Sequence, residues 1–180
     1  MGKYNGGSGA AVAMLIAALC AACHANAEFM KHYNPRPYIF SLDEYHTSVH
    51  SQRERRGDTK TANCIDCHGV HNIGDPTTAA FRLKSPEICA KCHTDESIMS
   101  KYGISTNVLN SYVADFHGTT VKLFEEQFPD QPTNKPVCTD CHGIHNIVKV
   151  DDLEAGIALR ENLLVKCQRC HPDATANFPS

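Results

Sequence analysis

The longest apolar run in the chain lies near its N-terminus. From Ala10 to Cys23 the sequence contains only Ala, Val, Met, Leu, Ile and Cys, and the small-residue string Ala25-Asn26-Ala27 follows. A short apolar run before an A-x-A site is typical of a secretory signal peptide, whereas a membrane-spanning helix needs about 20 apolar residues. We therefore expect residues 1–27 to be removed. The mature chain would begin at Glu28 and be exported, periplasmic or extracellular, with no transmembrane anchor.

Further along the chain, apolar residues recur at helical spacing. The stretch from Asp152 to Val165 predicts a helix that leads into a cysteine pair, and residues 108–128 predict one long helix or two short ones around His117-Gly118. The alternation of apolar and polar residues that marks strands is absent. We predict a mainly α fold with extensive irregular loops and little or no β-sheet.

The composition is poor in the residues that usually fill a protein interior. Of the 153 residues from 28 to 180, 33 are Leu, Ile, Val or Phe, about 22%, just above the level at which a chain struggles to form a core. Some other apolar material, or a set of cross-links, must therefore complete the interior. The net charge of −3, with both signs mixed along the chain, excludes a nucleic-acid-binding surface and a polybasic membrane patch.

Every cysteine lies in a C-x-x-C pair, and a histidine follows each pair directly. The five runs are Cys20-Ala-Ala-Cys23-His24, Cys64-Ile-Asp-Cys67-His68, Cys89-Ala-Lys-Cys92-His93, Cys138-Thr-Asp-Cys141-His142 and Cys167-Gln-Arg-Cys170-His171. Exported cysteine pairs can form disulfides, paired C-x-x-C units can bind zinc, and a single C-x-x-C can be a thiol redox site.

The histidines decide among these chemistries. With 11 histidines in 180 residues, a histidine would follow one pair by chance about 6% of the time, so five of five is roughly a one-in-a-million coincidence. Neither zinc ribbons nor disulfides need that histidine, but c-type haem does. The two thiols form thioethers with the porphyrin vinyl groups, and the adjacent imidazole binds the iron.

The first run differs from the others because it lies before the expected cleavage site. We therefore predict four haem c groups, with a fifth at Cys20, Cys23 and His24 only if the N-terminus is retained. The chain is expected to wrap around a closely packed chain of haems, which would supply the missing apolar interior. The predicted attachment cysteines are Cys64, Cys67, Cys89, Cys92, Cys138, Cys141, Cys167 and Cys170, and the proximal iron ligands are His68, His93, His142 and His171.

The mature chain contains an internal duplication, with two copies of one repeat unit. Each half has an upstream histidine, a C-x-D-C-H-G-(V/I)-H-N-I string and a second C-x-x-C-H run. The predicted organisation is an N-terminal arm at 28–45, a first di-haem repeat at 46–93, a connector at 94–116, a second di-haem repeat at 117–171 and a C-terminal tail at 172–180.

This repeat also supplies the second axial ligands. Four histidines at equivalent places, His50, His71, His117 and His145, match four irons, so we predict bis-histidine coordination throughout. On one helical turn, residues three apart project from nearly the same face. His71 would then serve a different iron from His68, and His145 a different iron from His142.

Two histidines before the first repeat are unassigned. His32 and His46 are interpreted as solvent-exposed residues of a Pro-containing arm. Alternatively, one of them replaces a predicted ligand, serves a fifth haem or binds iron in another subunit.

With these motifs, residues 46–171 resemble the small multihaem cytochromes c, especially the tetrahaem members. The resemblance implies electron transfer outside the cytoplasm through stacked haems of low potential. Methionine ligation is disfavoured because only Met30 and Met99 remain in the mature chain. Quinol-dehydrogenase tetrahaem proteins are similar in haem count, but they carry a spanning helix that this chain lacks.

The expected function is electron transfer between redox protein partners, without catalysis. One alternative is a subunit of an extracellular cytochrome filament, in which the chain assembles with itself. A third hypothesis is a multihaem reductase or oxidase, which needs one iron with an open position. The surplus of histidines argues against that.

Overall fold

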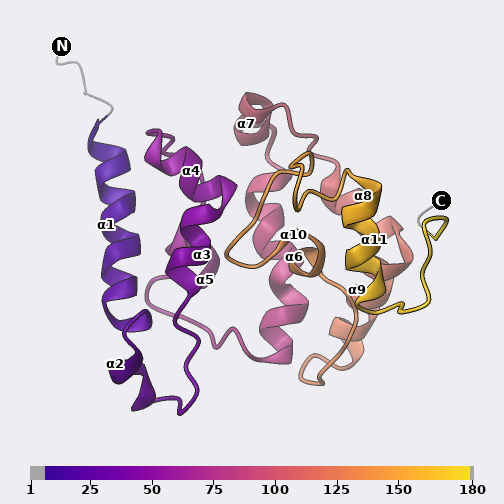
Figure 1. The fold of residues 1–180 in the computed structure, drawn as a ribbon, viewed down its shortest axis with the longest axis horizontal. Helices are drawn as coiled ribbons and strands as arrows, with labels where there is room; N and C mark the ends of the chain where they lie inside the picture. Colours follow the sequence, from indigo (N-terminus) through magenta and orange to yellow (C-terminus); the bar gives the residue numbers. More distant parts are fainter. Residues whose placement is uncertain (1–6, 179–180) are drawn as a thin grey trace. The chain divides into compact units, whose positions relative to one another are not determined.

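A computed structural model describes residues 7–178, with side chains described from Met14 onward. Within these residues the regular structure is helical, and none of them lies in a β-strand (Figure 1). The predicted mainly α fold with little or no β-sheet is confirmed. That the chain wraps around haems stays a prediction.

The chain forms two compact units. Unit 1 comprises the chain up to His71 together with Ile144–Val148, and unit 2 comprises Asn72–Gly143 and the chain from Lys149 onward. The helices of unit 1 are α1 (Gly7–His24), α2 (Ala27–Lys31), α3 (Ser41–Thr47), α4 (Val49–Arg55) and α5 (Cys64–His68). Those of unit 2 are α6 (Ala79–His93), α7 (Glu96–Met99), the 3-10 helix η1 (Ser100–Tyr102), α8 (Val108–Ala114), α9 (Phe116–Gln127), α10 (Cys138–His142) and α11 (Arg160–Gln168).

The region predicted to hold one or two helices around His117 forms two. Asp115 separates α8 from α9 because its backbone is extended, with φ −77° and ψ 153°. Its side-chain Oδ1 accepts a hydrogen bond from the His117 backbone N–H at 2.9 Å, which caps the start of α9.

The helix predicted from Asp152 begins later, at Arg160, so the predicted start is wrong. Asp152 Oδ1 accepts from the backbone N–H groups of Glu154 and Ala155 at 3.0 and 2.9 Å. These bonds hold residues 152–156 in a turn, since an aspartate side chain that caps local N–H groups competes with helix formation. The last part of the prediction holds, because α11 leads directly into Cys167.

Helix α6 contains a proline in its interior. Pro86 has no N–H for the Arg82 carbonyl, and the Ser85 hydroxyl donates to that carbonyl instead, at 2.7 Å. Because the Ser85 hydroxyl replaces the missing backbone donor, the helix continues to His93, the last residue of a C-x-x-C-H run.

Helix α1 covers most of the expected signal peptide. Of the helices in residues 7–178, none combines the length and the hydrophobicity that crossing a membrane requires. Removal of residues 1–27 stays a prediction.

The two units have different interiors. In unit 2, Leu83, Val121 and Val137 form a small apolar cluster, with Phe124 packed against it. In unit 1, the buried positions of α4 are Ser51 and Glu54. Many large apolar side chains elsewhere are exposed, as expected for a chain with few aliphatic residues available to build a core.

Candidate haem sites

The C-x-x-C-H runs lie on helical turns or at helix ends. Two of them form short helices of their own, α5 and α10, and two end α1 and α6. The fifth continues α11 by a turn in which His171 N–H donates to the Cys167 carbonyl at 2.8 Å. Because residues three and four apart share a helix face, each turn brings the two thiols and the imidazole together. This is the arrangement that attachment to one porphyrin needs.

The aspartate inside the two C-x-D-C-H runs fixes the start of each short helix. Asp66 Oδ2 accepts from the Asn63 N–H at 2.8 Å, and Asp140 Oδ2 accepts from the Val137 N–H at 2.7 Å. Both carboxylates therefore bind a backbone donor that the helix itself leaves unpaired, as in the second half of a capping box.

A glycine ends each of these helices directly after the proximal histidine. Gly69 has φ 80° and ψ −179°, and Gly143 has φ 90° and ψ 166°, a region that is essentially restricted to glycine. The helix does not continue to the second histidine, so the assumption that His68 and His71 share one helical turn is wrong. The same correction applies to the pair at 142 and 145.

In unit 1 the second histidine of one run faces the proximal histidine of another. The ring centres of His68 and His145 are 6.2 Å apart, with an angle of 33° between the planes. The Ile147 carbonyl accepts from the Val49 N–H at 2.8 Å, which attaches the segment 144–148 to the start of α4.

A carboxylate and a tyrosine orient His145. Its Nδ1 lies 3.6 Å from Glu44 Oε2, and the Tyr38 hydroxyl donates to the other oxygen of Glu44. The Tyr38 ring stacks on the imidazole, with ring centres 6.5 Å apart and planes at 18°. With the carboxylate beside Nδ1, Nε2 is the ring nitrogen left available for a metal, an arrangement common among metal-bound histidines.

Unit 2 contains a second pair of facing imidazoles. The ring centres of His117 and His171 are 6.3 Å apart, with planes at 58°. Asp115 Oδ1 lies 2.9 Å from Nδ1 of His117, and Phe178 packs against His171 with ring centres 4.9 Å apart. Here too a carboxylate holds Nδ1 of the predicted distal ligand and leaves Nε2 for a metal.

Both pairs have the spacing that one iron between two imidazoles requires. An imidazole nitrogen lies about 2 Å from a bound transition metal and about 1.1 Å from its own ring centre, so two axial imidazoles have ring centres roughly 6 Å apart. The observed 6.2 and 6.3 Å agree with this.

Burial lowers the pKa of His68, His93, His142 and His145. A lower pKa favours the neutral imidazole, the form that can bind iron.

The other predicted ligands lie in varied surroundings. His50 is half-buried on α4, and its carbonyl accepts from the Thr61 hydroxyl at 3.1 Å. His71 is exposed on the segment after α5. His93 and His142 lie near each other in unit 2, where His93 adds to the burial effect that lowers the His142 pKa. The two unassigned histidines, His32 and His46, are exposed.

No disulfide joins any of the ten cysteines, which all lie in the described part of the chain. The thiols of Cys89 and Cys138 are hydrogen-bonded to each other, so the first cysteines of two successive runs meet inside unit 2.

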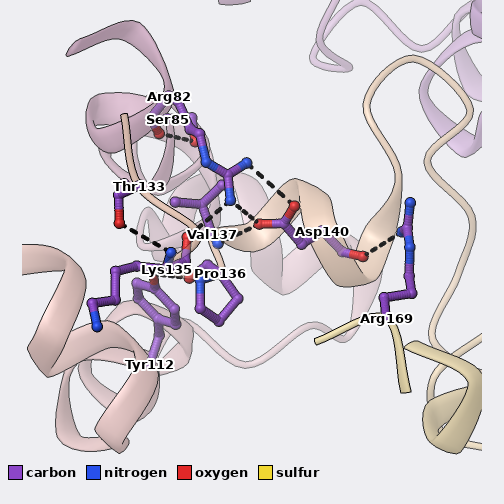
Figure 2. A network of polar contacts seen from close by, with 9 residues as sticks. All are labelled: Arg82, Ser85, Tyr112, Thr133, Lys135, Pro136, Val137, Asp140 and Arg169. Carbon is purple, nitrogen blue, oxygen red and sulfur yellow. Dashed lines mark hydrogen bonds and ion pairs between the residues drawn. The ribbon is translucent and has the colours of Figure 1, made fainter. Parts of the chain in front are cut away.

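A polar network around α10 was not predicted from the sequence (Figure 2). Arg82 binds both carboxylate oxygens of Asp140, at 3.2 and 2.9 Å, and also donates to the Lys135 carbonyl at 2.8 Å. Tyr112 donates to the Pro136 carbonyl at 2.8 Å, and Arg169 donates to the Asp140 carbonyl at 3.2 Å. The network holds the chain as it enters the Cys138 run, and the C-x-D-C-H aspartate was its one visible signal.

Comparison with known proteins agrees with the motif chemistry. Residues 57–98 match the family described as Doubled CXXCH motif, a segment that contains the Cys64 and Cys89 runs. The match supports a multihaem c-type cytochrome-like protein with covalently bound haem. No curated protein and no solved structure matches the chain significantly.

Proposed function

We propose that the chain is an electron-transfer protein that carries bis-histidine c-type haems at its Cys64, Cys89, Cys138 and Cys167 runs, outside the cytoplasm, and relays electrons between redox proteins. The observation that carries the proposal is the pair of facing imidazoles in each unit, His68 with His145 and His117 with His171, at the separation that one iron requires. His50 and His71 remain predicted distal ligands, as in the sequence analysis.

The chain's own residues perform the binding and the orientation. Eight thiols attach the haems, and the imidazole after each pair is the proximal ligand. Glu44 and Asp115 lie beside Nδ1 of His145 and His117, which would leave Nε2 of each proposed distal ligand available to a haem iron. When bound, each haem supplies a reversible one-electron iron couple, and two imidazole ligands keep its potential low compared with ligation by methionine.

Exposed apolar side chains next to the ligands also support porphyrin binding. Val70 and Ile73 flank His71, Ile144 precedes His145 and Phe116 precedes His117, and each of these side chains is more than half exposed. Flat apolar groups attached at the neighbouring cysteines would cover such side chains. They would also supply the apolar material that the composition lacks.

The test is a haem count combined with a spectrum of the iron. The protein purified from the cells that make it is expected to show covalent haem by intact mass. It should also give a wholly low-spin electron paramagnetic resonance spectrum, without carbon monoxide binding by the reduced form. A protein with no covalent haem would refute the proposal, and a high-spin iron that binds carbon monoxide would favour the catalytic alternative.

The second candidate function is that of a subunit in an extracellular cytochrome filament, which the resemblance to the multihaem cytochromes c suggests. Electron micrographs of concentrated protein distinguish it from a dispersed carrier, because a filament subunit forms ordered fibres whereas a carrier remains as separate particles.

A further inference from the structure

The first C-x-x-C-H run, which lies in the apolar N-terminal stretch, is in register with an internal repeat. Residues 20–33 read C-A-x-C-H-x5-M-x2-Y, and residues 89–102 read the same, with Met30 matching Met99 and Tyr33 matching Tyr102. Both copies are followed by L-x-x-Y-x4-H, ending at His50 and His117, and then by C-x-D-C-H-G-x-H-N-I. The first run is therefore the opening element of a tandem unit.

The helices formed by the two copies follow the same order. Helix α1 ends at His24 as α6 ends at His93, and a short helix with a capping side chain follows each, α2 after Asn26 and α7 after Asp95. Helix α1 packs against α2, α3, α4 and α5, and α6 packs against α7, α8, α9 and α10. Each contact of α1 thus has its counterpart in the other unit (Figure 1).

The reactive side chains are paired in the same way in both units. The thiols of Cys20 and Cys64 are hydrogen-bonded to each other, and so are those of Cys89 and Cys138. His24 lies close enough to His68 to add to the effects of burial and His145 on its pKa. His93 stands in the same relation to His142.

The tyrosine of the L-x-x-Y-x4-H string makes an equivalent bond in each copy. Tyr45 donates to the Ala62 carbonyl at 3.1 Å and Tyr112 to the Pro136 carbonyl at 2.8 Å, in each case two residues before the next haem run. An apolar leader with a chance cysteine pair would reproduce neither this register nor these contacts.

We propose that Cys20, Cys23 and His24 form a fifth covalent haem site in unit 1, equivalent to the site at Cys89, Cys92 and His93 in unit 2. The inference rests on the proposed function, because it takes the other C-x-x-C-H runs to carry haem. Each thiol adds across one vinyl group. A sulfur–carbon bond forms, the S–H bond breaks and its hydrogen passes to the neighbouring vinyl carbon, so no oxidant or reductant is consumed.

The proposal excludes the cleavage expected from the hydrophobic pattern. Removal of residues 1–27 would take away the whole site, so a chain that carries the fifth haem must retain α1. Helix α1 then acts as a scaffold of unit 1, consistent with the burial of Ala17, which is 4% exposed.

The test uses the full protein isolated from the cells that produce it. Trypsin cuts after Lys3 and Lys31, so the peptide of residues 4–31 is expected to carry one haem, and the intact protein five. A peptide 4–31 without haem, or a mature N-terminus at Glu28 with four haems, would overturn the inference and leave the proposed function intact. A protein without any haem would refute the proposed function itself.

A pair of variants provides the matched control. The double substitution Cys20→Ser with Cys23→Ser is expected to lower the haem count from five to four, as is Cys89→Ser with Cys92→Ser. An unchanged count in the first variant, beside a loss of one haem in the second, would contradict the fifth site. Peptide mapping of the unsubstituted protein gives the answer even where a variant fails to accumulate.

Discussion

Helices α4 and α9 occupy the same place in the two copies of the repeat, yet they bury different side chains. In α9 the buried residues are Gly118 and Val121, whereas the equivalent residues of α4 are Ser51 and Glu54. The Tyr45 hydroxyl lies 3.1 Å from Glu54 Oε2, while Val121 belongs to the apolar cluster with Leu83. The motif positions and the tyrosine anchors are thus the same in both units, although the interior behind them is polar in one and apolar in the other.

The anchoring of the aspartate in the C-x-D-C-H string also differs. In unit 2, Arg82 forms a two-point ion pair with Asp140. The matching residue of α1 is Ala13, and Asp66 is exposed. The repeat therefore requires the cap that each aspartate makes with the backbone, and the arginine is an addition in unit 2. The two copies share the cysteines and histidines of the C-x-x-C-H runs, whereas the side chains that pack around these runs differ between the units.

The largest effect is expected from the apolar cluster of unit 2. Leu83 is 1% exposed, and Leu83→Ala should destabilise the protein by about 2–5 kcal/mol through the cavity it leaves. Met14 occupies the equivalent position of α1 but is 47% exposed, so Met14→Ala should cost less than about 1 kcal/mol. Denaturant titration of the holo-protein checks the difference, and equal costs would show that the two interiors are alike.

A smaller effect on stability is expected from a substitution at Gly118, where α9 approaches α8. A Cβ added at Gly118 would lie 2.1 Å from the Tyr112 carbonyl oxygen, so Gly118→Ala should destabilise by about 1–3 kcal/mol through overpacking. At the matching position, the Ser51 hydroxyl is buried without a hydrogen-bond partner. Ser51→Ala should therefore be neutral or stabilising by about 1 kcal/mol. Thermal melts of the two variants test this, and a destabilising Ser51→Ala would contradict the alignment of the two helices.

Substitutions of the two C-x-D-C-H aspartates, Asp66 and Asp140, should differ less in their effect on the free energy of unfolding. Asp66→Ala removes a helix cap, which costs about 1 kcal/mol, whereas Asp140→Ala also removes the partner of Arg82. Because both members of that ion pair are about one-third exposed, the extra cost should be at most about 1 kcal/mol. The variant Arg82→Gln is the control, since it removes the ion pair but keeps the cap. Its denaturation midpoint should fall between those of Asp140→Ala and the parent protein.

The smallest effect concerns the carboxylates that lie beside Nδ1 of the proposed distal histidines. Glu44→Gln removes a negative charge near Nδ1 of His145, and it should raise the reduction potential of one haem by on the order of tens of millivolts. Asp115→Asn should do the same beside His117. Glu28→Gln, on the exposed pair with Lys31, is the control. Spectroelectrochemical titration checks these shifts, and a fall in potential would contradict the assigned roles.

The sequence alone predicted the helical character, because apolar spacing is a local signal, but it left open whether residues 108–128 form one helix or two. It did not predict that His145 faces His68, since that depends on a segment far along the chain bonding to α4 at Val49. The helix end after His68 was missed although Gly69 marks it in the sequence. The register of the first C-x-x-C-H run with the repeat was also missed, because the apolar residues around it favoured a leader peptide.

The position of each iron relative to the paired histidines is the most direct test of the proposed coordination. An anomalous difference map of the holo-protein, recorded at the iron absorption edge, locates every iron without assumptions about its ligands. We expect one iron between Nε2 of His68 and Nε2 of His145, and another between Nε2 of His117 and Nε2 of His171, each about 2 Å from both nitrogens. An iron bound to His68 or His171 whose other axial ligand is a different residue or a water would contradict the proposed coordination.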